Sequence, residues 1–142
     1  MREKLQTTVV MATYNGEKNI IEQLNSLKNQ SQKIDEVIIK DDCSTDQTVN
    51  IVRKFIEENQ LQATWQLIVN EENVGWRKNF FKLLDLASKD VVFTCDQDDI
   101  WHEKKIEEMS RTFANQQVQV LVSDYHELVE PGGLAEELKR VD

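Results

Sequence analysis

Three carboxylates, Asp96, Asp98 and Asp99, lie within four residues directly after the apolar run Val91–Phe93. A short apolar run bounded by polar residues is typical of a buried strand, so these acids are expected at a strand's carboxyl end. In open α/β sheets, ligands bind at that end. Because crowded negative charges repel one another, the three side chains favour a hard divalent cation held by oxygen ligands. The alternative interpretation is a polar loop with an acidic cap for the next helix.

The composition predicts a single globular domain. With 142 residues the chain can bury a substantial core but is too short for two ordinary domains. Its net charge of −9 argues against nucleic acid as a partner, because binding the phosphate backbone needs a basic surface. If the ligand is itself a phosphate, something must bridge two sets of negative charge.

The two cysteines, Cys43 and Cys95, are too few for a disulfide framework, and their spacing matches no zinc motif. We expect free thiols that serve packing, and reduced thiols suit a cytosolic location. The sequence contains no apolar run of membrane-spanning length and no signal sequence. We therefore expect a soluble, cytoplasmic chain that could still work at the inner face of a membrane through regions absent from this sequence.

Strand-like and helix-like segments alternate along the chain. Apolar, β-branched runs predict strands at 7–13, 36–40, 64–69, 91–95 and 118–123. Helical spacing predicts helices after the first four strands: from Glu17 with Asn15 as N-cap, behind a Ser44–Gln47 capping box, after Gly75, and over 103–115. Beyond Asp124 the pattern weakens. The alternation predicts an α/β fold, with a parallel sheet and helices on both faces.

Each polar cluster lies where a predicted strand passes into a helix, at 13–15, 41–46, 73–77 and 96–99. These clusters should converge on one rim of the sheet. The rim carries neither a P-loop nor a dinucleotide-binding glycine fingerprint. An EF-hand is excluded because Ile100 and Trp101 stand where an oxygen ligand and glycine are required. The only histidines, His102 and His126, form no persuasive catalytic arrangement.

Four motifs in order, VVMATYNG, DEVIIKDDCSTDQT, NVGWRKN and FTCDQDDIW, resemble the N-terminal nucleotide-binding part of a family 2 (GT-A fold) glycosyltransferase. The DQDDIW form is especially similar to bacterial rhamnosyltransferase-like and polysaccharide-assembly members. The resemblance covers roughly residues 6 to 125. It implies a truncated, Rossmann-like GT-A sheet, with a nucleotide-sugar-binding half-domain at 1–125. Residues 126–142 would then form a loop and short helix leading toward an acceptor-binding part that is missing.

The resemblance also implies roles for individual residues near the nucleotide. Thr13 and Tyr14, followed by Asn15, match the strand end that packs around the base and ribose. Asp42 matches the aspartate that hydrogen-bonds the base, and Asp41 is its less certain partner. Ser44 and Asp46 are expected to cap the following helix instead.

Two further motifs would complete the donor site. Asn73, Gly75 and the basic pair Arg77 and Lys78 match the segment flanking the donor, although a solvated helix start is an equal alternative for the two basic side chains. Asp96, Gln97 and Asp98 match the D-x-D motif, with Asp99 beside it. In the family this motif meets the ribose and the metal on the pyrophosphate, which implies Mg²⁺ or Mn²⁺ as cofactor. Trp101 could line the sugar pocket, with a packing role as the alternative, and His102-Glu103 departs from the subgroup's pattern.

The implied donor is a UDP- or dTDP-linked sugar, and the implied reaction is inverting, hexosyltransferase-type transfer to a glycan or lipid-linked acceptor. That reaction needs a general base, which the family places well downstream of the D-x-D motif. After Asp124 the sequence offers no strand framework to position one, so we expect a chain that binds the donor but transfers sugar poorly. The alternatives are a phosphorylatable receiver-like signalling domain, a sugar nucleotidyltransferase and a catalytically silent nucleotide-binding module.

Overall fold

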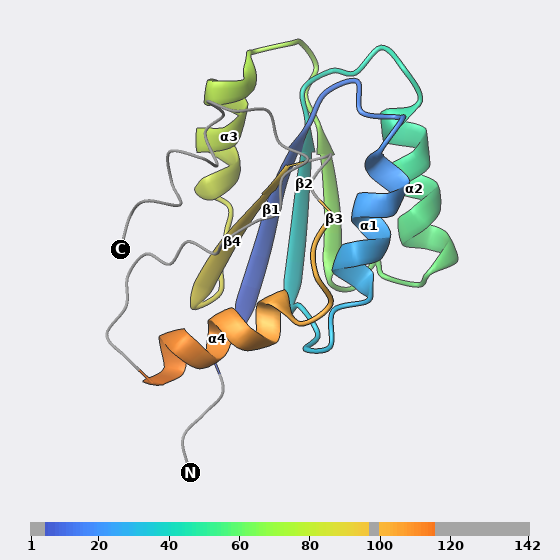
Figure 1. Ribbon diagram of the computed structural model, residues 1–142. Helices are drawn as coiled ribbons and strands as arrows, with labels where there is room; N and C mark the ends of the chain where they lie inside the picture. The colour runs from blue at the N-terminus through green and yellow to red at the C-terminus, as the bar shows by residue number, and fades with distance from the viewer. Residues whose placement is uncertain (1–4, 97–99, 116–142) are drawn as a thin grey trace, which may run out of the picture.

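The computed structural model describes residues 5–96 and 100–115 (Figure 1). Strands and helices alternate strictly, as the sequence predicts. Their bounds are β1 Thr7–Thr13, α1 Ile20–Lys28, β2 Glu36–Asp41, α2 Thr48–Glu58, β3 Trp65–Val69, α3 Trp76–Leu84, β4 Val91–Asp96 and α4 Lys105–Asn115. The predicted strand 118–123 and the segment 126–142 lie outside the described residues.

All four strands are parallel and form one sheet in the order β3-β2-β1-β4. The register pairs Thr13 with Asp41, Asp41 with Val69, and Ala12 with Asp96. The carboxyl ends of the strands therefore form one rim. This confirms the predicted parallel sheet and explains why polar residues far apart in sequence come together there.

Helices cover both faces of the sheet (Figure 1). On one face α1, α2 and α4 bury the larger apolar cluster, which includes Val9, Met11, Leu24, Phe55 and Ile106. On the other face α3 buries a smaller cluster of Val10, Ile38 and Leu83. Alternate residues of the central strands thus enter opposite cores, which is why these strands are continuously apolar. None of the described helices is long and apolar enough to cross a membrane.

Two predicted helix starts are wrong. Helix α1 begins at Ile20 with Asn19 as N-cap, whereas Asn15 lies in a turn with φ +47°. Helix α2 begins at Thr48, and Ser44 does not cap it because the Ser44 hydroxyl donates to Asp41. Across the rim, the Ser44 hydroxyl accepts the Asn15 N–H and Asn15 Oδ1 accepts the Thr45 N–H, contacts that local spacing cannot reveal. Asp46 supports the start of α2, because its carboxylate accepts the Thr48 N–H at 2.9 Å, but Gln47 is the N-cap residue.

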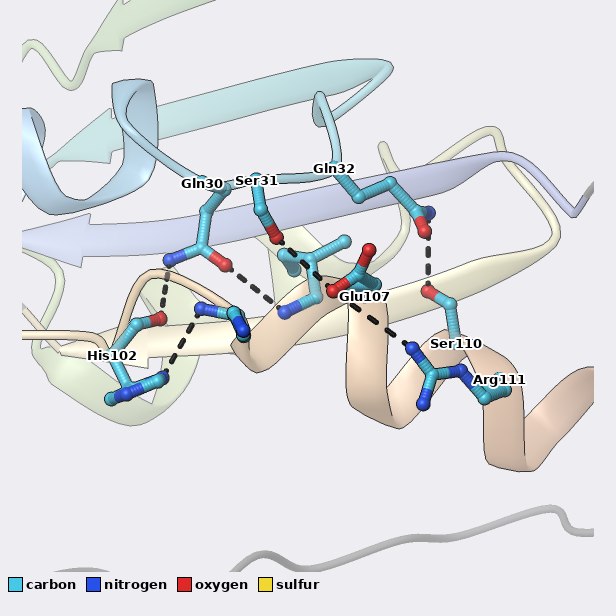
Figure 2. Close-up of polar contacts among 9 residues, drawn as sticks. Gln30, Ser31, Gln32, His102, Glu107, Ser110 and Arg111 are labelled. Atoms are coloured by element: carbon cyan, nitrogen blue, oxygen red, sulfur yellow. Dashed lines mark hydrogen bonds and ion pairs between the residues drawn. The ribbon is translucent and has the colours of Figure 1, made fainter.

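A polar clamp joins the end of α1 to the segment that starts α4 (Figure 2). The buried Gln30 amide donates to the His102 carbonyl at 2.8 Å and accepts the Ile106 N–H at 3.0 Å. The Ser31 N–H donates to the Glu103 carbonyl at 2.7 Å. These bonds anchor the chain shortly after the acidic stretch, so both flanks of that stretch are tied to the body of the fold.

Candidate functional site

The ends of β1 and β2 are joined through the buried carboxylate of Asp41. Its Oδ1 accepts the Thr13 hydroxyl at 2.6 Å and the Ser44 hydroxyl at 2.7 Å, and its Oδ2 accepts the Ser44 N–H at 2.8 Å. Asp41 and Thr13 are both buried. The structure therefore brings these two predicted site residues into direct contact beneath the rim.

Asp42 points to the opposite side of β2 and holds the turn before α3. Its Oδ1 accepts the Val74 N–H at 2.8 Å and the Asn70 amide at 2.9 Å, and its Oδ2 accepts the Gly75 N–H at 3.0 Å. Only 2% of Asp42 is exposed. Burial raises the pKa of this carboxyl, but the three hydrogen bonds and the nearby charge of Lys40 outweigh it and hold the pKa below its ordinary value. Asp42 is consequently ionised at neutral pH.

Each of the two aspartates keeps capacity to accept one more hydrogen bond. An ionised carboxylate has about four acceptor positions, and three are used on each side chain within the described residues. On both Asp41 and Asp42 the remaining position belongs to Oδ2. Each carboxylate therefore has one acceptor position that these structural contacts do not use.

The turn after β1 carries an exposed aromatic ring. Tyr14 is 46% exposed, whereas Thr13 before it is buried. Asn15 fixes the turn against the β2 loop: its N–H donates to the Ser44 hydroxyl at 2.9 Å and its Oδ1 accepts the Thr45 N–H at 2.8 Å. The backbone beside Tyr14 is thus held in place while the side chain faces solvent.

The predicted residues of the third cluster divide into two groups. Asn73 donates from its amide to the Asp42 carbonyl at 3.2 Å, and Gly75 contacts the Asp42 carboxylate through its N–H. Arg77 and Lys78 lie in the exposed first turn of α3. The Arg77 guanidinium lies 5.3 Å from the ring centroid of the exposed Trp76. The structure thus joins Asn73 and Gly75 to Asp42 and leaves the two basic side chains in solvent.

The acidic stretch is only partly described. Asp96 ends β4 beside Ala12, while Gln97, Asp98 and Asp99 lie outside the described residues. No set of three His, Cys, Asp or Glu side chains that could hold a metal occurs within 5–96 and 100–115. Carboxylate oxygens are the donors that Mg²⁺ and Mn²⁺ favour, so the chemistry of the stretch fits such an ion, and the metal site stays a prediction.

Trp101 packs into the core. It is 5% exposed, its ring centroid lies 6.2 Å from that of Phe93, and the Lys105 ammonium lies 4.5 Å from its centroid. Its backbone N–H donates to the Ser26 hydroxyl at 3.1 Å. These contacts favour the packing role over a place in the sugar pocket. Its indole N–H has no hydrogen-bond partner among the described residues.

The strand order locates the natural ligand position. The chain passes from β1 outward to β2 and β3, and then crosses to the other side of β1 to form β4. Ligands of open parallel sheets bind where the order reverses, outside the carboxyl ends of the strands. Here that point lies between β1 and β4, so Tyr14 and Asp96 flank it. The fold and the rim together define an α/β protein with a ligand site at its topological switch point.

The chain belongs to Glycosyl transferase family 2, whose sequence profile matches residues 8–132. It is 40% identical over 104 residues to the dTDP-rhamnosyl transferase RfbG of Shigella flexneri. The matched region covers 68% of this chain and 34% of RfbG. It is 37% identical over 106 residues to the poly(ribitol-phosphate) beta-N-acetylglucosaminyltransferase TarS of Staphylococcus aureus, covering 73% of this chain and 18% of TarS. This membership confirms the resemblance and argues against a receiver-like domain.

Solved structures agree with this assignment. Residues 1–349 of S. aureus TarS in complex with UDP-GlcNAc match with a TM-score of 0.71 and 32% identity, over 80% of this chain and 32% of that one. The mannosyltransferase PcManGT from Pyrobaculum calidifontis, in complex with GDP-Man and Mn²⁺, matches with a TM-score of 0.67 and 25% identity, over 78% of this chain and 32% of that one. The chain therefore spans about a third or less of the length of these relatives.

Proposed function

We propose that this chain is the donor-binding part of a glycosyltransferase and binds a nucleoside-diphosphate sugar at the rim between β1 and β4. The observation that carries the proposal is the pairing of an exposed Tyr14 ring with two buried carboxylates that each keep one acceptor position. Similarity to TarS, solved with UDP and with UDP-GlcNAc, supports this class of ligand. Similarity to a dTDP-rhamnosyl transferase makes a dTDP-linked donor the other candidate.

The rim residues suit the recognition of a pyrimidine nucleotide. Uracil and thymine both present an imide N–H, which a carboxylate accepts, and a base with a different edge would leave that buried carboxylate unpaired. Asp42 is our first candidate for this contact, and Asp41 is the second. The flat ring of Tyr14 would stack on the base or ribose. Thr13 and Asn15 would act by fixing the backbone on either side of that ring.

We further propose that Asp96 and Asp98, with Asp99 beside them, hold Mg²⁺ or Mn²⁺ against the diphosphate. Such an ion would neutralise the donor's phosphates and stabilise the leaving nucleoside diphosphate. The PcManGT complex with Mn²⁺ supports divalent cations in related enzymes. This ion would also explain how a chain with net charge −9 binds an anionic donor.

The remaining steps would fall to parts of a longer enzyme. We propose that residues 1–125 form the donor half, and that the general base and the site for a glycan or lipid-linked acceptor lie beyond it. On this proposal the 142-residue chain binds donor in the cytoplasm, at the inner face of the membrane if its acceptor is lipid-linked, but turns over poorly or not at all. Robust sugar transfer by this chain alone would contradict that part of the proposal.

Titration calorimetry with UDP, dTDP and GDP, each with Mn²⁺ and with EDTA, tests the proposal. We expect UDP or dTDP to bind more tightly than GDP, and EDTA to weaken binding. Tyr14→Ala should weaken binding by about tenfold, the range expected for loss of one aromatic–base stack. Leu86→Ala is the matched control, because Leu86 is similarly exposed but lies between the carboxyl end of α3 and the start of β4, at the opposite end of the sheet from the rim. Failure of all three nucleotides to bind would favour a silent module.

A further inference from the structure

A chain of polar side chains lies behind Asp42, on the face of the sheet that α3 covers. The Asn70 amide nitrogen donates to Asp42 Oδ1 at 2.9 Å and to Asn79 Oδ1 at 2.8 Å. The Asn79 amide nitrogen donates to the Lys40 carbonyl at 3.0 Å, and the Lys40 ammonium donates to Asn70 Oδ1. Lys40 of β2, Asn70 after β3 and Asn79 of α3 therefore form a closed ring of hydrogen bonds, to which Asp42, the residue after β2, is bonded through Asn70.

The chemistry of the end groups fixes the direction of every bond in this network. The Lys40 ammonium can only donate, so the oxygen of the Asn70 amide must face it. The nitrogen of that amide then faces Asp42, which when ionised can only accept. The same nitrogen meets the oxygen of Asn79, whose own nitrogen is left for the Lys40 carbonyl. Neither amide can rotate by 180° without placing two donors or two acceptors against each other.

Three of the four side chains in the network are buried, and Asn70 is half-buried, so the loss of one hydrogen bond would be costly. Asn79 is 1% exposed, Lys40 is 9% exposed, and Asp42 is nearly as buried as Asn79. Burial and the nearby charge of Lys82 lower the pKa of Lys40, and the charge of Asp42 opposes this shift. A buried polar network that is fully paired specifies one arrangement, whereas an unpaired member is costly. Asp42 thus has one preferred orientation rather than several.

The same network sets the start of α3. The Asn79 N–H donates to the Gly75 carbonyl at 3.0 Å, closing the first turn of the helix whose entry Asp42 holds from below. Asn70 also donates its own N–H to the Asp41 carbonyl at 2.8 Å. Asn70 is therefore bonded to the backbone or side chain of both candidate base-reading aspartates and to the helix that follows.

We propose that Asn70 is a positioning residue of the donor site, which orients the Asp42 carboxylate and the Asn73–Gly75 turn without touching the nucleotide. This inference rests on the proposed nucleotide-binding function. Asn70→Asp is a near-isosteric change that keeps an acceptor for Lys40 but removes the donor to Asp42 and places a second negative charge beside it. Losing that bond should weaken UDP binding by about tenfold.

The experiment compares wild type, Asn70→Asp and Asn59→Asp by calorimetry with UDP and Mn²⁺, and by amide hydrogen exchange. Asn59 is a matched control, because its oxygen accepts the Lys28 ammonium at 2.7 Å and its nitrogen donates to the Phe55 carbonyl at 2.8 Å, at the far end of α2. We expect Asn70→Asp to weaken UDP binding and to speed exchange at Val74 and Gly75, with the β1 amides unchanged. A general loss of stability would instead speed exchange in β1 as well.

The outcomes separate this inference from the proposed function. If wild type binds UDP and Asn70→Asp binds within twofold of it, the inference is wrong while the proposed function stands. Unchanged exchange at Val74 and Gly75 in Asn70→Asp also overturns the inference. If wild type binds no nucleotide, the proposed function fails and this inference fails with it. Should Asn70→Asp not fold, Asn70→Ser removes the amide without adding charge and is held to the same two criteria.

Discussion

Replacing Asp42 by asparagine tests how much the rim depends on one carboxylate. In the native site three donors converge on this side chain, from Val74, Gly75 and Asn70, at 2.8 to 3.0 Å. An asparagine keeps one oxygen and turns an amide nitrogen toward at least one of these donors. A buried hydrogen bond to a charged group contributes about 1.5–3 kcal/mol, and a buried donor left unpaired costs about 1–3 kcal/mol. Partial relaxation leaves an expected loss of about 2–4 kcal/mol in unfolding free energy.

Thermal melting of the 142-residue chain measures this loss. For a chain of this length, 1 kcal/mol shifts Tm by about 4 °C, so we expect Asp42→Asn to lower Tm by roughly 8–16 °C. Glu57→Gln is the matched control, because it makes the same carboxylate-to-amide change at an exposed position of α2 and should cost less than about 0.5 kcal/mol. If the two variants melted together, the contacts of Asp42 would not hold the turn.

The pH dependence of the stability difference between wild type and Asp42→Asn gives a second check on the role of the Asp42 carboxylate. Because the pKa of Asp42 lies below its ordinary value in the folded state, ionisation stabilises the fold, and this contribution is fully present above about pH 4. As the pH falls through the lowered pKa of the folded state, the contribution is lost. The stability gap between wild type and Asp42→Asn should therefore be constant near neutral pH and narrow below about pH 4. A gap that widened in acid would refute the assignment.

Two other substitutions test the parts of the fold that frame the site. Gln30→Leu should lower the free energy of unfolding in urea by about 2–4 kcal/mol, because it removes the partners of the buried Ile106 N–H and of the part-buried His102 carbonyl. Gln32→Leu is the control and should cost much less, because the Gln32 amide makes only a 3.5 Å contact. Gly75→Ala should lower the free energy of unfolding by about 1–3 kcal/mol, measured by thermal melting. The cost would come from backbone strain at φ +92° and ψ 152° and not from a steric clash, since an added Cβ would meet no atom within 4 Å. If Gly75→Ala were as stable as wild type, the turn before α3 would be able to adopt another conformation.

The strands were predictable from sequence because a central parallel strand is buried on both faces. Continuous apolar runs such as the one around Val37–Ile39 leave few alternatives, and the structure confirms them within one residue at the ends. The meeting of polar clusters on one rim followed from the same alternation, since parallel strands all end on one side. Contacts of Thr13 with Asp41, and of Asp42 with Gly75, bear this out.

What the sequence did not reveal were bonds between residues far apart in the chain. Asn15 and Ser44 have the local spacing of helix caps, but Asn15 Oδ1 accepts the Thr45 N–H and the Ser44 hydroxyl accepts the Asn15 N–H, in both cases from about 30 residues away across the rim. The Ser44 hydroxyl also donates to Asp41, three residues before it. Asn70 belongs to no recognised motif, and its only local sign was a lone asparagine directly after a strand. Asn79 ends the NVGWRKN motif, but nothing in its spacing pointed to a contact with Asn70. Arg77 and Lys78 lie in an exposed helix start, which is compatible with both interpretations of these side chains.

The outer edge of β4 has a consequence for handling the protein. Within the described residues β4 pairs only with β1, so one row of its N–H and C=O groups lacks a strand partner, and Val92 beside that row is 40% exposed. The strand carries no proline and no charge before its final residue. Bare, uncharged edges readily recruit strands from other molecules. Within the described residues this edge is therefore the place where a further strand could add to the sheet, so light scattering should check for self-association before any titration.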